Sequence, residues 1–419
     1  MDIFLINNLI YQVFLIPIIF FSIACYVVAF LAIFTKSKSL KFQKLNNSKW
    51  PRVSIQIPVF NDPVAIRCIE KCLKFDYPKN KFEIIVADDS NEEKTIKILN
   101  DYLKNCPEKV KLIRRKDRKG FKAGALNNAL NHSSGKYIVV LDSDFIPKED
   151  FLRKIIYPFL SNQKIGIVQS RCGYINYEQN LISRFSAMRY MIYYNCFMPI
   201  NNRLGSVFFA GTGGAIKRSI LEKVGGWNED SIQEDADLSV KIINTGHKNI
   251  YLSNVKVEGE IPYDLEGIIS QQNRLIYGTT RVFLDHWRKI FSRNFSTIQK
   301  FIIFFMTFWP FATVFMVGGA ITGQISWMTA PQKSISINSL YPYLWILVSS
   351  SGFILLSSIG LYRDGKIKDI FKMIFVTYTL GVILSFFSAF AFTKALLKRK
   401  MAWKVAPKLG NNSILNMRH

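Results

Sequence analysis

Long uncharged stretches lie toward both ends of the chain. No charged residue occurs at positions 3–35, 301–332, 334–362 or 373–393. Each stretch is long enough for one helix to cross a hydrocarbon core of about 30 Å. The first lacks a basic leading segment and a small-residue cleavage site, so it predicts an anchor rather than a cleaved signal peptide. The pattern indicates one N-terminal and three C-terminal membrane-associated segments.

The middle of the chain alternates between two other patterns. Strands that alternate with helices at short spacing form a mostly parallel sheet with helices on both faces, and ligands bind at the carboxyl ends of its strands. The predicted fold class is therefore α/β. Short β-branched runs predict strands at 53–59, 83–87, 109–113, 136–141 and 165–169, and the segments between them predict helices at 62–74, 93–105, 123–131 and 148–160.

Two further segments mix aromatic residues with polar or basic ones. Residues 264–296 predict an amphipathic helix in the membrane interface. Residues 181–197, rich in Met, Tyr and Phe, predict either a similar helix or a buried core helix. The chain then divides into a transmembrane anchor (1–36), an α/β domain (50–262), interface helices (263–297), a transmembrane region (298–395) and a basic tail (396–419).

The net charge of +25 is concentrated beside the hydrophobic stretches. Lysines crowd residues 36–49, and only basic charges follow Phe392. Such flanks are typical of the cytoplasmic side of membrane proteins, so a lipid bilayer is the expected partner and a nucleic acid is not. We expect an integral protein of the cell (plasma) membrane or an endomembrane, with the α/β domain in the cytoplasm. The six cysteines form no C-x-x-C pair, which favours a reducing compartment without structural zinc.

The same charges predict a topology. If residues 36–49 are cytoplasmic, the N-terminus lies outside, and the two crossings after the α/β domain return the chain to the cytoplasm at 363–366. A fourth crossing would place the basic tail outside, against the positive-inside rule. We therefore predict that residues 370–393 form an interfacial or re-entrant helix that does not fully cross, although the segment is long enough to do so.

Acidic residues follow two of the predicted strands. A D-D-S turn containing Asp89 closes the strand at 83–87, and a D-S-D turn containing Asp142 and Asp144 closes the strand at 136–141. Two carboxylates two residues apart can share a hard cation such as Mg²⁺ or Mn²⁺, which then binds diphosphate oxygens. The same spacing elsewhere is usually a solvated turn, and its place after a strand is what favours a metal site.

Further polar residues suit transfer to a hydroxyl group. Asp235, in a Q-E-D turn, could take a proton from an acceptor or cap the helix at 236–244. Gln271 and Arg274 lie one helical turn apart, where the arginine could bind a departing diphosphate. Lys122 precedes a small-residue turn, which suits a phosphate or ribose contact. The other basic residues of 109–122 are expected to form a solvated face that steers an anionic donor.

In this order, and preceded by Q-I-P-V-F-N-D at 56–62, these segments resemble the inverting family 2 glycosyltransferases. The resemblance covers about 53–287 and is greatest to the processive β-glycan synthases, cellulose synthase and the cellulose-synthase-like mannan and glucan synthases. It implies a GT-A type fold and a nucleotide-sugar donor such as UDP-glucose or GDP-mannose. It also implies a Mg²⁺ or Mn²⁺ cofactor and transfer of a hexose to a growing β-glycan.

The resemblance further implies roles for single residues of this chain. Asp235 would be the catalytic base. Asp89, Lys122, Asp142, Gln271 and Arg274 would bind the donor, Asp142 and Asp144 would hold the metal, and Phe209, Gly211, Thr212, Glu234 and Leu275 would contact the acceptor.

Departures from the family pattern keep a second acceptor open. Gln233 stands where the family has Thr, and the two acids that follow, Glu234 and Asp235, are present as in the family pattern. Leu275 replaces the Trp of Q-x-x-R-W, which stacks on an acceptor sugar, and so favours transfer of a single sugar to a lipid such as a polyprenyl phosphate or ceramide. W-K-V-A-P-K at 403–408 resembles the gating segment of polymer-making members and favours a β-glycan instead. A transporter or receptor is the rival of another class, but the hydrophobic stretches carry none of the charges expected of one.

Overall fold

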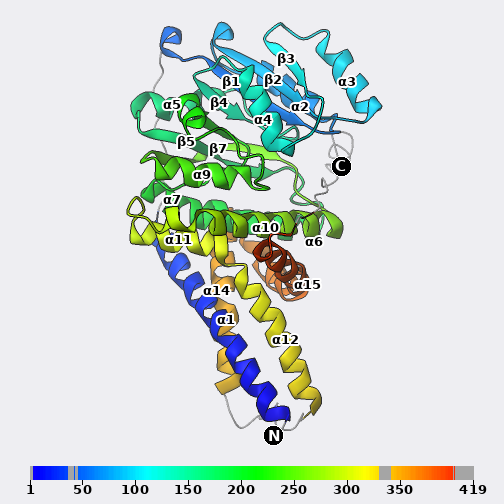
Figure 1. The fold of residues 1–419 in the computed structure, drawn as a ribbon, viewed down its shortest axis with the longest axis vertical. Helices are drawn as coiled ribbons and strands as arrows, with labels where there is room; N and C mark the ends of the chain where they lie inside the picture. The colour runs from blue at the N-terminus through cyan, green and yellow to red at the C-terminus, as the bar shows by residue number, and fades with distance from the viewer. Residues whose placement is uncertain (1–2, 36–41, 43–45, 330–340, 400, 402–419) are drawn as a thin grey trace.

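The computed structural model describes residues 3–35, 42, 46–329, 341–399 and 401. Within them, an α/β domain lies on a layer of helices that run across its lower side. Three long helices extend from this layer toward the N-terminal end of the molecule (Figure 1). The gating-like segment at 403–408 lies outside the described residues.

A seven-stranded sheet with the order β3-β2-β1-β4-β6-β5-β7 forms the centre of the α/β domain. The four strands from β3 to β4 are parallel, β6 is antiparallel to both of its neighbours, and β7 is parallel to β5. The mostly parallel α/β class is therefore confirmed. The strands are β1 (Val53–Val59), β2 (Phe82–Asp88), β3 (Val110–Arg114), β4 (Tyr137–Val140), β5 (Ile165–Tyr174), β6 (Gly214–Lys217) and β7 (Lys248–Gly259).

Helices cover both faces of the sheet, which is why its central strands are mostly apolar and almost entirely buried. Leu152 and Ile155 belong to the core on one face, and Leu126 and Trp227 belong to the core on the other. α2 (Ala65–Leu73), α3 (Glu93–Leu103) and α5 (Phe151–Ser161) contribute to the first core, and α4 (Phe121–Asn131), α8 (Arg218–Lys223) and α9 (Glu234–Asn244) to the second.

Below the sheet lies a layer of helices that includes α10 (Leu265–Ile290), which has the amphipathic pattern predicted for 264–296. Of the two interpretations of 181–197, the structure has the buried one, because Phe185 and Met188 pack against Met373 of the last helix. The layer also contains α6 (Leu181–Ile192), a π-helical turn (Tyr193–Phe197), α7 (Met198–Leu204) and α11 (Thr297–Phe308).

α1 (Ile3–Phe34), α12 (Phe311–Thr329) and α14 (Tyr341–Arg363) run away from the α/β domain, with α1 packed against the other two (Figure 1). Among the described residues, three helices are long and apolar enough to cross a membrane, at Phe4–Phe34, Phe311–Thr329 and Ile367–Leu396. The uncharged stretch 301–332 does not form one span. It breaks at Trp309–Pro310 into α11 and α12, because proline has no N–H to continue the helix.

The last helix, α15 (Ile370–Leu396), differs in direction from the other long helices. Figure 1 shows α15 nearly end-on beneath α10, whereas α1, α12 and α14 are seen from the side. It packs mainly along α10 and the adjoining part of α12. The expectation that 370–393 does not fully cross concerns a bilayer and stays a prediction.

Candidate active site

One cavity of about 1670 Å³ joins the sheet to the long helices. This exceeds the roughly 300–1,000 Å³ of a pocket for one small ligand. The part at the carboxyl ends of β1, β2 and β4 is called the sheet arm, the part between α1, α12, α14 and α15 the helix arm, and the part between them the junction. The sheet arm is lined by residues that include Phe60, Asp89, Arg118, Lys122, Asp142 and Asp144, the junction by Arg189, Tyr190, Asp235, Gln271, Arg274 and Leu275, and the helix arm by Tyr11, Leu15, Ile18, Met316, Gly323, Phe353 and Val382.

The D-S-D turn after β4 presents two carboxylates to the sheet arm. Asp142 Oδ1 accepts a hydrogen bond from Lys122 Nζ at 2.7 Å, and its backbone N–H donates to Thr212 Oγ1 at 2.8 Å. Asp144 Oδ2 accepts from the backbone N–H of Glu260 at 2.8 Å. Two carboxylates on one short turn, open to a cavity that can admit a diphosphate, match the oxygen ligands that Mg²⁺ and Mn²⁺ prefer. The residues present therefore fit the expected cation.

The part of the sheet arm beyond β1 and β2 contains Asp89 and three residues of the loops around it. Asp89 pairs with Arg115, whose Nε donates to Oδ1 at 3.0 Å. The guanidinium of Arg118 lies 3.3 Å from the centre of the Phe60 ring. The basic run 109–122 was predicted to be a solvated face, and this is wrong for Arg115 and Arg118. Arg118 lines the cavity and lies on an aromatic ring, and Arg115 is held beside the cavity by the carboxylate of Asp89.

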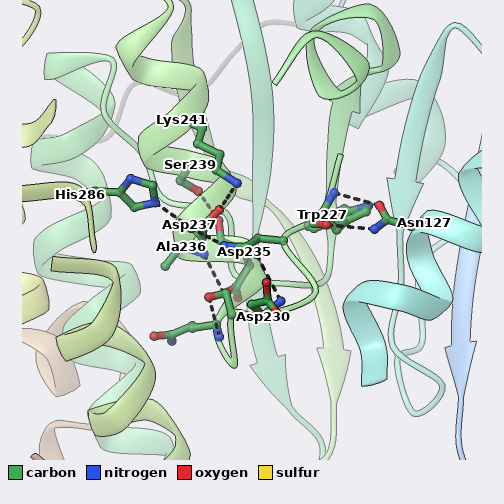
Figure 2. A network of polar contacts seen from close by, with 12 residues as sticks. Asn127, Trp227, Asp230, Asp235, Ala236, Asp237, Ser239, Lys241 and His286 are labelled. Atoms are coloured by element: carbon green, nitrogen blue, oxygen red, sulfur yellow. Dashed lines mark hydrogen bonds and ion pairs between the residues drawn. The ribbon is translucent and has the colours of Figure 1, made fainter. Parts of the chain in front are cut away.

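Asp235 lines the junction from the first turn of α9 (Figure 2). Its Oδ1 accepts from the backbone N–H of Ala236 at 2.8 Å. Burial and the neighbouring Glu234 carboxylate raise the pKa of Asp235 to about 7, against the opposing charge of Lys122. Glu234 is buried beside it and lies outside the cavity lining among the described residues, and burial raises its pKa as well. A carboxylate with a pKa near neutrality can accept a proton from a hydroxyl group.

Gly211 brings the F-A-G-T segment into contact with Asp235. Its φ is +77°, and a Cβ there would lie 2.9 Å from Asp235 Oδ2 and 3.4 Å from Lys122 Nζ. Lys122 Nζ also donates to the carbonyl of Gly211 at 3.0 Å. Thr212 contacts Asp142 as described, whereas the Phe209 ring packs on Trp227 in the core with a centroid separation of 5.8 Å. The segment therefore contacts Asp235, Lys122 and the carboxylate turn at once.

A buried polar network connects α9 to α10 (Figure 2). Asp237 Oδ2 lies 2.7 Å from His286 Nε2, and Asp237 Oδ1 lies 2.6 Å from Lys241 Nζ. Because a carboxylate only accepts, Nε2 of the histidine carries the proton. Burial alone would raise the pKa of Asp237, but hydrogen bonds from His286 and Lys241 outweigh it and lower the pKa to about 2. The network fixes the helix of Asp235 against the helix that carries Gln271 and Arg274.

Comparison with known proteins is consistent with this arrangement. The family described as "Glycosyltransferase like family 2" matches residues 51–278, which include Asp89, Asp142, Asp235 and Arg274. This chain belongs to that family.

Among the chain's relatives within family 2 are plant proteins. Glucomannan 4-beta-mannosyltransferase 7 of Arabidopsis thaliana is 29% identical over 274 residues, which are 62% of this chain and 49% of that protein. The probable glucomannan 4-beta-mannosyltransferase 6 of Oryza sativa subsp. japonica is 25% identical over 389 residues, 87% of this chain and 64% of that protein. The chain thus spans about half to two thirds of the length of these relatives.

A solved structure shares the fold of this family 2 chain. It is the mannosyltransferase PcManGT from Pyrobaculum calidifontis in complex with GDP-Man and Mn²⁺. The TM-score is 0.66 at 19% sequence identity, and the similarity covers 94% of this chain and 100% of that one. At this identity the similarity concerns the fold, which is the GT-A type predicted above.

The structure brings most of the predicted site residues of this family 2 chain to one cavity. Asp89, Lys122, Asp142, Asp144, Phe209, Thr212, Asp235, Gln271, Arg274 and Leu275 line it, Gly211 lies behind Asp235, and Glu234 is buried beside it. Sequence reasoning missed Arg189 and Arg118. Arg118 had a usable signal, because it lies four residues before Lys122 in the basic run, whereas Arg189 stands in a Met- and Tyr-rich segment that predicts packing.

Proposed function

We propose that the chain is a membrane-bound, inverting hexosyltransferase that uses a nucleoside diphosphate sugar and a divalent cation, Mg²⁺ or Mn²⁺. The observation that carries this proposal is that Lys122, Asp142, Asp144, Asp235 and Arg274 line one cavity although they come from four separate segments. Membership of family 2 supports it. The pKa of Asp235, raised to about 7, suits a base that works near neutrality.

The side chains divide the reaction between them. Asp235 takes the proton of the acceptor hydroxyl. The oxygen of that hydroxyl attacks the anomeric carbon, and the bond from this carbon to the diphosphate oxygen breaks. Lys122 and Arg274 stabilise the negative charge on the departing nucleoside diphosphate. Asp142 and Asp144 would hold the cation, which supplies further neutralisation of the diphosphate when bound. One direct displacement of this kind inverts the anomeric configuration.

GDP-mannose is the first donor to test, because the curated relatives are named mannosyltransferases and the structure of similar fold contains GDP-Man and Mn²⁺. UDP-glucose is the second. The ring of Phe60 and the guanidinium of Arg118 would lie against the nucleobase. Asp89 and its loop would contact the nucleoside.

Two acceptors remain candidates. The names of the plant relatives support a growing β-glycan. The helix arm supports a lipid acceptor, because no charged residue of the described chain lines it. Several hydroxyl groups of the helix arm already have hydrogen-bond acceptors within the protein. Thr313, Thr377 and Ser385 donate to backbone carbonyls three or four residues before them. A glycan needs free hydrogen-bonding partners, whereas an alkyl or prenyl chain does not.

Purified protein in detergent, incubated with Mn²⁺ and each labelled donor, tests the proposal. A β-glycan product should be cut by linkage-specific glycosidases, and a lipid product should extract into an organic phase. The Asp235→Asn variant serves as the blank. If neither donor is bound or transferred in the presence of a membrane lipid extract and oligosaccharide acceptors, the proposed function is wrong.

The proposed location is the cell membrane or an endomembrane, with the α/β domain in the cytoplasm. The apolar helices and the lysines at 36–49 support it. Impermeant maleimide applied to intact cells should leave Ser413→Cys, made in a cysteine-free background, unlabelled until the cells are permeabilised. Labelling of intact cells would mean that α15 fully crosses and that the basic tail lies outside.

A further inference from the structure

Arg189 stands out at the junction because none of the described residues supplies a counter-charge for it. Its Nη2 donates to the neutral amide oxygen of Gln272. Its Nη1 is buried without a hydrogen-bond partner, and no carboxylate of the described residues pairs with it. Arg115 and Arg67 of the α/β domain, by contrast, pair with Asp89 and Glu260. Arg189 is half-buried, so part of the cost of removing a cation from water applies to it, and an anion is expected to complete the site.

The position of Arg189 indicates which anion could reach it. Gln272, its neighbour on α10, donates through Nε2 to Ser388 Oγ of α15 at 3.0 Å. Arg189 therefore lies where α6, α10 and α15 meet, at the entrance from the junction to the uncharged helix arm. Along α1, lining residues from Tyr11 to Cys25 extend the arm by about 21 Å at 1.5 Å per residue. A ligand with one anionic group and a long apolar chain matches this order of surfaces.

Arg189 is also close to the proposed chemistry. Burial raises the pKa of the Tyr190 hydroxyl, and the charges of Arg189, Arg274 and Asp235 all act on it. Arg189, Tyr190, Asp235 and Arg274 all line the junction, so the cation, the arginine assigned to the diphosphate and the proposed base face one part of the cavity. An anion on Arg189 would place the groups attached to it beside Asp235.

We propose that Arg189 binds a phosphate group of a lipid acceptor whose apolar chain occupies the helix arm. The proposal rests on the transferase function above and names the acceptor class of that site. A guanidinium fork matches phosphate oxygens, and the apolar lining between α1 and α12 accepts the chain. The phosphate is either bonded to the acceptor sugar or is itself the group that receives the hexose.

Binding measurements on the full chain in detergent test the site without requiring turnover. The probes are geranylgeranyl phosphate and its neutral match geranylgeraniol, followed by intrinsic fluorescence, to which Trp309 in the cavity contributes. Wild-type protein should prefer the phosphate by at least about tenfold, the range of charge-assisted hydrogen bonds. Arg189→Gln should lose this preference and keep its affinity for the alcohol, and Arg189→Lys should retain part of it.

Arg184→Gln is the matched control, because Arg184 lies on the same helix but pairs with Glu178 and Asp369. It should keep the preference, and thermal melting establishes that each variant is folded. An intact preference in folded Arg189→Gln would overturn the proposal. So would a loss of GDP and UDP affinity with the lipid preference unchanged, since Arg189 would then hold the leaving diphosphate. A normal phosphate preference in a protein that transfers no sugar would refute the proposed function and leave the site standing.

Discussion

The two arms of the cavity differ in the charge of the residues that line them. The sheet arm contains ion pairs, as in Lys122 with Asp142 at 2.7 Å and Arg115 with Asp89. In the helix arm, no charged residue of the described chain lines the wall. Arg189, at the entrance to the helix arm, is charged like side chains of the sheet arm, but no carboxylate of the described residues pairs with it.

The difference indicates how each arm selects its ligand. In the sheet arm, contacts to a nucleoside diphosphate and its cation can replace the existing ion pairs at modest cost, because the charged side chains are already held in place. An uncharged wall selects by apolar area and shape instead. Under the proposed function, transfer would take place in the sheet arm and the junction, and the helix arm would select the acceptor.

Loss of the base should have the largest effect. Asp235→Asn should lower kcat by about 10²–10⁴-fold, because the amide cannot accept the proton of the acceptor hydroxyl. Affinity for donor and Mn²⁺ should persist, since Asp142 and Asp144 are unchanged, whereas Asn at either of those positions should abolish transfer by weakening both. Rapid-quench assays and titration with GDP separate the two effects. Full activity in Asp235→Asn would refute the assignment of the base.

A methyl group at Gly211 should be the next most damaging change. Gly211→Ala would place Cβ 2.9 Å from the Asp235 carboxylate, and a displaced base can cost about 10²-fold in kcat. Gly225→Ala is the control, because its φ of +86° is as unfavourable but nothing lies within 4 Å of the added atom. Both variants should lose about 1–2 kcal/mol of stability from the positive φ. Equal kcat values would show that the contact at Gly211 is unimportant.

The sheet arm follows closely from the sequence, and the reason is local. The strand predicted at 53–59 has those bounds, and the acidic turns follow directly from the ends of β2 and β4. In a parallel sheet these ends must share one edge, so motifs that are far apart in the sequence are brought together by the fold class alone. The pairing of Lys122 with Asp142 follows from the same edge.

The helix arm could not be predicted in this way. Its wall is assembled from four helices whose sequences show only that they are apolar, and their crossing directions depend on tertiary packing. The direction of α15 and the break at Pro310 decide which residues line the arm. β6 and β7 were missed for a related reason. β6 has four residues and begins with Gly214, and β7 mixes polar with apolar positions.

The pH dependence of transfer should report the junction. Because Asp235 must be deprotonated to act, kcat/KM should fall by about tenfold for each pH unit below the pKa, which is raised to about 7. An ordinary carboxylate would place this limb near pH 4. Affinity for GDP with Mn²⁺, measured over the same range, controls for titration of the donor site. An acidic limb below pH 5 would contradict the assignment.

The connection between α9 and α10 should have a smaller effect. His286→Ala leaves the buried Asp237 carboxylate without its partner on α10 and should cost about 1–3 kcal/mol of stability, with a reduced kcat. Lys241 contacts the same carboxylate from within α9, four residues away, and is itself partly exposed, so Lys241→Ala should cost less than His286→Ala. Thermal or denaturant unfolding measures both. Equal losses of stability would mean that the hydrogen bond between α9 and α10 contributes no more than the contact within α9.

The smallest expected effect separates the two acceptors. Leu275 lines the junction, and Leu275→Trp would restore the aromatic surface that stacks on a sugar in the related β-glycan synthases. A β-glycan acceptor should then bind more tightly by about 1–3 kcal/mol, the range of aromatic stacking sites, and products should lengthen. An acceptor held by a phosphate on Arg189 and a chain in the helix arm gains nothing from this ring, so its KM should be unchanged or higher. Comparing KM for oligosaccharide and lipid-phosphate acceptors in both proteins decides the matter, and longer products in the variant would contradict a lipid acceptor.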